Sequence, residues 1–435
     1  MDDNVMGDAE KQAGLKVIIA KLHSGMAVSE VKREFAQLIK GVSAEEIAAM
    51  EQSLIDEGFP PEEIQRLCEV HVQVFESALE KGRSGTSMSG HHAHSSKAEN
   101  REAEIRLRGL LSLARSWSWK ARVGALKSPV AMESQKAQAR AAVEDLGKII
   151  IHFARKENQL FPFLERHGFT GPSKVMWGKH DEIRAALKAL AAAIDEGPGA
   201  FRSHSRSVAT SMRRMFFMEE RILLPNAMRK LSEREWAEIR RGEDAIGFAW
   251  VQPGAEYDAG IVMAKGAAGS GSALAAFTAA AVAGSASSSS EATPAPATVA
   301  DAVSLNTGSV SAAILDIALR NLPIDLSIVD DQDRVLYFSD SAHRLFPRSP
   351  AVIGRDVQNC HPQKSVAMVE KILDAFKKGE RDSARFWLEM DGKFVVIEYR
   401  ALRDSSGKYL GTLETGQDAT ELRSLSGQRR LLEWD

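Results

Sequence analysis

Cysteine, a charge excess of either sign and long apolar runs are all scarce in this sequence. Of its 435 residues only Cys68 and Cys360 are cysteines, which excludes a disulfide framework and a zinc site built from cysteines. Lys and Arg number 56 against 59 Asp and Glu, for a net charge of -3. A chain so balanced has no field that attracts phosphate backbones or anionic lipid, so we expect no nucleic-acid partner.

Targeting and catalytic signatures are missing as well. No apolar run reaches the roughly 18 residues of a membrane helix, because the nearest candidate, residues 267–299, is mostly Ala, Ser, Gly and Thr. The N-terminal text MDDNVMGDAEKQ is acidic and lacks the apolar core of a signal peptide. Neither a Gly-rich phosphate loop nor a basic recognition helix occurs. We therefore expect a cytoplasmic protein, in a reducing compartment, with no integral membrane segment.

What the sequence contains is three blocks and a spacer, so we expect a multidomain protein. Residues 10–81 carry apolar positions at helical spacing and predict an all-α N-terminal block. Residues 88–250 hold four long helical segments separated by Gly and Pro, which predict an antiparallel four-helix bundle. Residues 251–308 are dominated by Ala, Ser and Gly. This composition buries too little apolar surface to fold, so we interpret the stretch as a linker.

The last block, residues 309–430, changes to a strand pattern. A helix is predicted at 312–321 and another at 364–378. The strands are LSIVD and VLYFS between the helices, then ARFWLEM, KFVVIEYRAL and YLGTLETGQD after them. Period-2 alternation with tight turns predicts an antiparallel sheet in an α+β sensor-like domain. The same alternation places Phe386, Trp387 and Phe394 in the core of the sheet.

The most informative feature is a repeat inside the bundle. HFARKENQLFP, residues 152–162, and MFFMEERILLP, residues 215–225, align without a gap. In this alignment His152 matches Met215, and Lys156 matches Glu219. A His and a Glu one turn apart on facing helices is how a bundle holds carboxylate-bridged iron. The repeat therefore predicts an iron site in the bundle interior.

Longer motifs carry a resemblance to a known family. They are GHHAHSSKAEN (90–100), HFARKENQLFPFLERHGFTGPSKVMWGKHDEIR (152–184) and MEERILLP (218–225), with NLPIDLSIVDDQDRVLYFS and VIGRDVQNCHPQKSV in the last block. The sequence resembles the hemerythrin (HHE cation-binding) family, in the version with a DUF438 helical domain before the bundle and a PAS domain after it. This resemblance implies a hemerythrin-like bundle with non-haem iron, as a di-iron centre, followed by a PAS-like sensor domain.

The metal ligands that the motifs and the resemblance suggest are His91, His94, His152, Glu157, His180, Glu219 and Glu220. Two positions depart from the family pattern. Lys156 stands four residues after His152, where the family has Glu, and Met215 stands where a ligand His is usual. The standard set of five histidines and two carboxylates is therefore incomplete, which argues against reversible O2 carriage and leaves open which glutamate faces inward.

Structural roles are the alternative for several of these residues. His180 has apolar neighbours at helical spacing and could be a satisfied core histidine. His94 lies eleven residues before Ile105, near the same helical face, and His91 precedes it by about one turn. Both could instead belong to a frayed, polar helix start. Glu99 is a weaker candidate, because an acid at this place is more often a solvated first-turn residue.

A second candidate site lies in the last block. Cys360 and His361 stand between the second strand and the following helix, where PAS domains line their ligand pocket. A thiolate or an imidazole there could bind haem iron or another ligand. The alternative is a turn that begins the next helix. We expect this alternative, and no stoichiometric haem.

These features favour a sensor in signal transduction. In this hypothesis the iron site responds to O2, NO or redox state, the PAS domain relays a second cue, and an unidentified protein partner receives the output. The alternatives are an iron-handling or NO- or peroxide-reducing enzyme, and a metal-free interaction scaffold. Whether the protein is an enzyme stays open. A homodimer through the PAS domain is possible, and the sequence does not identify the sensed molecule.

The spacer yields a testable prediction. Mild proteolysis of the full chain should cut first between residues 255 and 305, since unpacked linkers are nicked before folded domains, and should leave stable fragments of roughly 250 and 130 residues. Electrophoresis and mass spectrometry of the fragments measure this. Protection of this stretch as strong as that of the bundle would contradict the domain division.

Overall fold

Residues 88–126, 128–269 and 302–428 are described in the computed structural model, together with isolated positions between residues 13 and 57. Apart from those positions, the all-α block predicted for residues 10–81 lies outside the described residues. The chain divides into two compact units, Met1–Gly269 and Ser270–Asp435. Within the described segments, no helix combines the length and the apolar character that crossing a bilayer requires.

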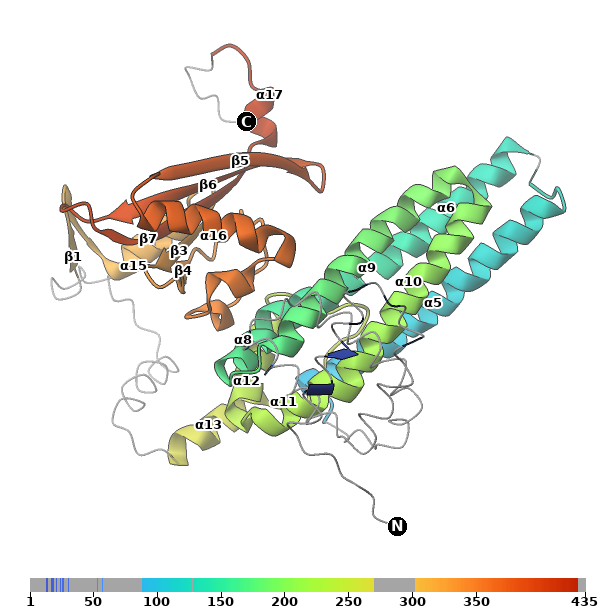
Figure 1. Ribbon diagram of the computed structural model, residues 1–435, viewed down its shortest axis with the longest axis horizontal. Coiled ribbons are helices and arrows are strands. Elements are labelled where there is room, and N and C mark those ends of the chain that lie inside the picture. The colour runs from blue at the N-terminus through green and yellow to red at the C-terminus, as the bar shows by residue number, and fades with distance from the viewer. Residues whose placement is uncertain are drawn as a thin grey trace, which may run out of the picture. The chain divides into compact units, whose positions relative to one another are not determined.

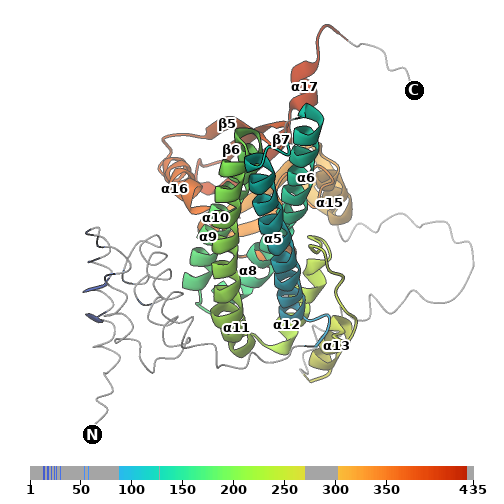
Figure 2. The same cartoon turned by 90° about the vertical axis from the view of Figure 1, so that its right-hand side faces the viewer.

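The first unit contains the predicted antiparallel four-helix bundle. Its helices α5, α6, α9 and α10 run side by side (Figures 1 and 2). The first helix is α5 (His92–Arg122), and the third is α9 (Gly171–Glu196). The second consists of α6 (Pro129–Gly147), α7 (Ile149–Arg155), η2 (Lys156–Leu160) and α8 (Phe161–Arg166). The fourth consists of α10 (Pro198–Met218), η3 (Glu219–Leu223) and α11 (Leu224–Lys230).

Apolar residues at helical spacing form the interior of this bundle. On α5 the buried positions Ala103, Leu107, Leu110, Ala114 and Trp117 follow one another at intervals of three or four residues, and none is more than 2% exposed. This spacing places them along one stripe of the helix. The stripe continues toward the N-terminus of α5 with polar instead of apolar residues, which is where the site described below begins.

A π-helical turn interrupts the second helix and another interrupts the fourth, at matching places in the repeat. The N–H of Phe161 donates to the carbonyl of Lys156, and the N–H of Leu224 donates to that of Glu219, five residues back in each case. A proline follows each of these donors, and proline has no N–H with which to continue the α-helical pattern. Such single π turns are frequent at functional sites.

Two further helices follow the bundle. The helix α12 (Glu233–Glu243) begins with a capping box between Ser232 and Glu235. The helix α13 (Ala259–Gly269) lies inside the segment predicted as linker. The backbone N–H of Tyr257 donates to the carbonyl of Ser89 at 2.9 Å, which ties the start of this segment to the bundle. The linker prediction for residues 251–308 therefore differs from the structure at its first end.

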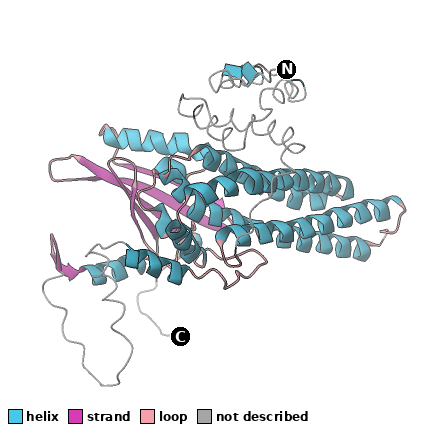
Figure 3. Cartoon of the chain, turned by 90° about the horizontal axis from the view of Figure 1, so that it is seen from below, coloured by secondary structure: helices cyan, strands magenta, loops and turns pink. Residues whose placement is uncertain are grey.

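The second unit is the predicted α+β domain, and its strands appear together in Figure 3. A hairpin of β1 (Ala302–Leu305) and β2 (Gly308–Ser311) precedes α15 (Ala312–Arg320), so the predicted linker differs from the structure at its second end too. The main sheet is antiparallel with the order β4-β3-β7-β6-β5. Its strands are β3 (Asp325–Asp330), β4 (Val335–Phe338), β5 (Ser383–Met390), β6 (Lys393–Arg403) and β7 (Tyr409–Asp418). The helix α16 (Gln363–Lys377) connects β4 to β5.

The core of this domain includes two clusters of buried side chains. Val329, Val357, Val369 and Leu373 form one. Phe376, Val395, Ile397, Tyr399 and Tyr409 form the other. The prediction that Phe386 and Trp387 are core residues was wrong, because these side chains are 36% and 65% exposed. They lie on β5, an edge strand with a single neighbour, so alternation alone did not bury them.

Gly411 provides a test of how closely β7 and β3 approach. Its φ is +152°, and a Cβ atom added there would lie 2.1 Å from the carbonyl oxygen of Val329. We expect Gly411→Ala to lower the free energy of unfolding of the PAS-like unit by at least about 2 kcal/mol. Calorimetry of the full chain measures this. Gly308→Ala is the control, since an added Cβ meets nothing within 4 Å there; equal stability of the two variants would contradict the close approach.

Candidate functional site

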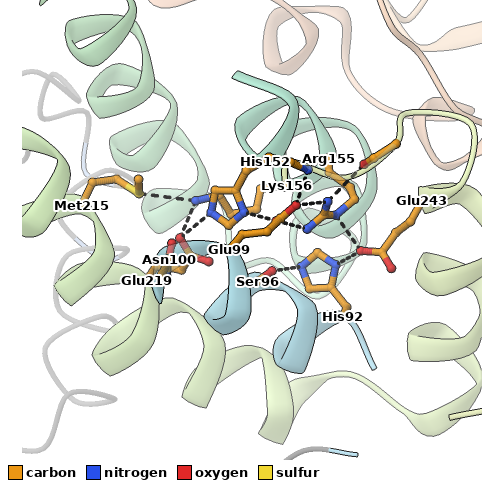
Figure 4. A network of polar contacts seen from close by, with 12 residues as sticks. His92, Ser96, Glu99, Asn100, His152, Arg155, Lys156, Met215, Glu219 and Glu243 are labelled. Atoms are coloured by element: carbon orange, nitrogen blue, oxygen red, sulfur yellow. Dashed lines mark hydrogen bonds and ion pairs between the residues drawn. The ribbon is translucent and has the colours of Figure 1, made fainter. Parts of the chain in front are cut away.

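A network of charged side chains fills the polar end of the bundle interior (Figure 4). Its members come from α5, from the second and fourth helices and from α12, and all are 0% exposed: His92, Glu99, His152, Arg155, Lys156, Glu219 and Glu243. Charges withdrawn from water destabilise a protein unless partners compensate them. The stability of this network therefore depends on how its opposite charges pair.

Lys156 and Glu219, the matching residues of the repeat, form the central pair. The Nζ atom of Lys156 donates to Oε2 of Glu219 at 2.6 Å. The same ammonium lies 3.4 Å from Sδ of Met215. Nε2 of His152 lies 3.1 Å from Oε2 of Glu219. The repeat therefore brings its own two copies into contact, with the ammonium group between them (Figure 4).

A second group around Arg155 connects this pair to the rest of the unit. Nδ1 of His152 contacts Oε2 of Glu99 at 2.7 Å, and Arg155 donates to both oxygens of that carboxylate. The Nε atom of Arg155 lies 2.9 Å from Glu243 on α12, and Nδ1 of His92 contacts the same oxygen at 2.6 Å. These bonds hold α12 against α5 and the second helix.

His180 and Glu157 form a separate pair beside the network. Nδ1 of His180 contacts Oε1 of Glu157 at 2.7 Å, and Arg184 donates to both carboxylate oxygens at 2.9 and 2.8 Å. The imidazole stacks on the ring of Phe153, with centroids 4.2 Å apart. Nε2 of His180 is buried and has no hydrogen-bond partner among the described residues. This imidazole is thus oriented through Nδ1 while its second nitrogen is left unpaired.

Burial and neighbouring charges set the protonation of these groups. Burial opposes ionisation of Glu99 and Glu157. Contacts with His152 and Arg155 outweigh burial at Glu99 and lower its pKa to about 2. Contacts with His180 and Arg184 do the same at Glu157, whose pKa is also about 2. Lys156 and His152 outweigh burial in the same way and lower the pKa of Glu219. Burial lowers the pKa of Lys156. Burial and then repulsion by Lys156 lower the pKa of His180 to about 3, so this imidazole is neutral at pH 7.

The structure brings four of the predicted ligands together in two pairs and places the other three elsewhere. His152 and Glu219 face each other in the network, and Glu157 and His180 pair beside it, as the preceding distances show. His91 caps α5 instead, because its Nδ1 accepts the N–H of Ala93 at 3.1 Å. It is 5% exposed, so it does not belong to a frayed helix start.

The remaining two predicted ligands lie farther out. His94 is half-buried. Ile105, eleven residues later and near the same face of α5, is 59% exposed, so this face turns toward solvent. Glu220 accepts a hydrogen bond from Asn100 at 3.1 Å. It lines a surface groove of about 380 Å³ between α5 and α10.

The sequence did not single out His92 or Glu243, and it ranked Glu99 as a weaker candidate. His92, not His91 or His94, is the histidine at the start of α5 that joins the network, and it shares a face with Ser96 and Glu99, four and seven residues on. That spacing could have found them. Glu243 follows buried Trp236 by seven residues, which is the same signal on α12.

These residues do not fit a di-iron centre. Among the described residues, no three His, Cys, Asp or Glu side chains converge in an arrangement that could hold a metal ion. The histidines are instead distributed over different carboxylates. The one oxygen that faces His152 Nε2, Oε2 of Glu219, already accepts the ammonium of Lys156 at 2.6 Å. A divalent cation at that oxygen would repel this neighbour, so the site favours an ammonium over a metal.

The second candidate site, in the PAS-like unit, is also polar. Arg348 donates to Oε2 of Glu414 at 3.1 Å, and the hydroxyl of Tyr399 donates to Oε1 at 3.1 Å. His361 is close to Glu414 and Arg348, and its Nε2 is buried without a hydrogen-bond partner in the described segments. Burial lowers the pKa of His361. The thiol of Cys360 points to the carbonyl of Asp356, at 3.7 Å.

Comparisons with known proteins agree with this architecture. The profile of the DUF438 family, described as a family of unknown function, matches residues 15–81. The hemerythrin HHE cation binding domain matches residues 122–227, and the PAS domain matches residues 315–420. No curated protein matches the chain.

Solved structures similar to the chain cover about a quarter of it. A C-terminal domain from Streptococcus mutans is 32% identical over 29% of this chain and 97% of its own, with a TM-score of 0.28. A sensory box sensor histidine kinase from Vibrio cholerae is 16% identical over 25% and 90%, with a TM-score of 0.20. The PAS domain of BvgS from Bordetella pertussis is 20% identical over 26% and 90%, with a TM-score of 0.21.

Burial of His91 makes the bundle sensitive to acid. Burial and then His92 lower the pKa of His91 from 6.5 to about 4. Between these values the unfolded chain binds a proton that the folded chain does not, so the contribution of His91 to stability is full above pH 6.5 and is lost as the pH falls to 4. His91→Asn keeps a side-chain acceptor for the helix cap but does not titrate.

We therefore expect the melting temperature of wild type to fall as the pH is lowered from 6.5 to 4. The melting temperature of His91→Asn should depend less steeply on pH over the same range. Circular dichroism melts of the full chain measure both. His167→Asn is the control, because His167 is a partly exposed residue paired with Glu235 at 2.7 Å. A slope in His91→Asn equal to that of wild type would contradict the assignment.

Proposed function

The chain combines a DUF438 domain, a hemerythrin HHE cation-binding domain and a PAS domain, and from this combination we propose that it is a cytoplasmic signalling protein. It detects a small molecule in the PAS domain and passes the signal on by contact with a partner protein. The bundle supplies a rigid helical body whose polar end is closed by ion pairs.

The observation that carries this proposal is the set of unpaired polar atoms inside the PAS domain. Nε2 of His361 and both terminal nitrogens of Arg344 are buried without a hydrogen-bond partner among the described residues. Arg344 forms an ion pair with Asp325, but their 3.6 Å separation is too long for a hydrogen bond. Buried polar groups are nearly always satisfied, so such atoms suggest a site for a polar ligand. The charge that acts most strongly on His361 is the carboxylate of Glu414, followed by Arg348 and Arg355. Because Arg348 and Tyr399 already bind Glu414, the arginines near His361 favour a small anion as the ligand.

The outer surface of the PAS domain suits a protein partner. On the edge strand β5, Phe386 and Leu388 lie on one face of the sheet and Trp387 on the other, and they are 36%, 37% and 65% exposed. Exposed aromatic residues on an edge strand are typical of interaction surfaces. This surface supports output through protein contact, including pairing with a second copy of the chain.

One observation favours a second candidate, an iron-dependent response to O2, NO or redox state. His180 donates through Nδ1 to a carboxylate and leaves Nε2 unpaired within the described part of the chain, which is how metal-binding histidines are usually prepared. This candidate, like an iron-handling or NO- or peroxide-reducing enzyme, requires stoichiometric iron. The ammonium of Lys156 beside Glu219 argues against it. A metal-free scaffold remains compatible with the same geometry.

The proposed PAS site is tested by ligand-dependent stability. A set of small carboxylates and inorganic phosphate is added to the full chain, and the melting transition of the PAS domain is measured. A ligand at about 100 times its Kd should stabilise that domain by about 2.7 kcal/mol. His361→Asn should weaken the response at least tenfold in Kd.

His343→Asn is the matched control, because His343 is an exposed histidine of the same domain. It should respond like wild type. If no compound of either class shifts the transition, or if His361→Asn responds as wild type does, the anion site in the PAS domain is wrong.

A further inference from the structure

The centre of the bundle repeat is occupied by a charge of the protein's own. Lys156 and Glu219 hold equivalent positions in the two copies of the repeat, and each begins a π turn. The other equivalent residues, His152 and Met215, touch the same pair, at 3.1 Å from Glu219 and 3.4 Å from Lys156. The ammonium thus lies between the two copies of the repeat (Figure 4), inside the segment that the HHE cation-binding profile matches.

The charges around it require a cation. Four buried carboxylates, those of Glu99, Glu157, Glu219 and Glu243, belong to the interior. Arg155 binds Glu99 and Glu243, and Arg184 binds Glu157. Lys156 is the cationic side chain that contacts Glu219. A carboxylate buried at 0% exposure without this partner would be strongly destabilising.

We propose that the ammonium of Lys156 is the resident cation of this bundle and takes the place of a metal ion. The bundle then folds without metal, and the same ammonium excludes divalent cations from Glu219 and His152 by charge. This inference does not depend on the ligand proposed for the PAS domain, because the two sites lie in different units.

A charge exchange at one position tests the inference. In Lys156→Glu the two copies of the repeat both present a carboxylate, with His152 facing them, so the variant should acquire a metal site. The full chain is incubated anaerobically with ferrous iron, desalted and assayed for metal. Wild type should retain less than about half an equivalent and melt at the same temperature with or without chelator. Lys156→Glu should retain about one equivalent and melt higher with iron than with chelator.

Lys148→Glu is the matched control. It makes the same charge change between α6 and α7, at a lysine whose side chain is 55% exposed and contacts Asp145 at 2.9 Å. It should gain no iron. A full equivalent of iron on wild type that His152→Ala abolishes would overturn the inference and support the iron-dependent candidate. If folded Lys156→Glu binds no iron, the inference that the Lys156 ammonium takes the place of a metal ion is wrong.

A double-mutant cycle covers the case in which Lys156→Glu does not fold. Lys156→Met and Glu219→Gln each leave one partner buried without its counterpart, and each should lower the melting temperature by about 10 °C. The double variant removes both charges and should melt higher than either single variant. Additive losses would show that the two residues are not coupled, and the inference would fail.

Discussion

The buried contact between Lys156 and Glu219 is the interaction on which the rest of the bundle interior depends. Both side chains are fully withdrawn from water, and neither could stay ionised there without the other. Because the ammonium of Lys156 compensates the charge of Glu219, His152 can contact both Glu219 and Glu99. Glu99 in turn holds Arg155 and the backbone N–H of Ala249, so the ion pair supports the packing of α12 and of the segment that follows it.

The repeat explains why the pair lies where it does. Each copy contains a π turn before its proline, and each turn begins with one member of the pair. The π turn adds one residue to the helix, so the residues after it are shifted relative to those before it. Lys156 and Glu219 stand before this shift, because their N–H groups still donate to the carbonyls of His152 and Met215, four residues back. A lysine in one copy and a glutamate in the other then complement each other, whereas two carboxylates at these positions would need a bound cation.

The PAS domain also buries charged side chains, but it compensates them less completely. Glu414 is held by Arg348 and Tyr399, but His361 and Arg344 keep buried nitrogens without partners among the described residues. In the bundle each of the four buried carboxylates contacts a cationic side chain, whereas in the PAS domain some buried polar nitrogens have no hydrogen-bond partner among the described residues. This contrast is the basis of the proposals that the PAS domain binds the small molecule and that the bundle has a structural role.

The sequence by itself determined the architecture. Helical spacing and period-2 alternation located the four bundle helices and the five strands of the main sheet to within a few residues, because burying apolar side chains on one face is a local, periodic requirement. The repeat identified His152, Lys156, Met215 and Glu219 as one group. Only the tertiary structure decided their chemistry. Which histidine of 91, 92 and 94 faces inward, and that Glu243 from α12 completes the network, depend on contacts across more than a hundred residues. Whether Lys156 interrupts a metal site or replaces its ion depends on the distance to Glu219, which no local pattern encodes.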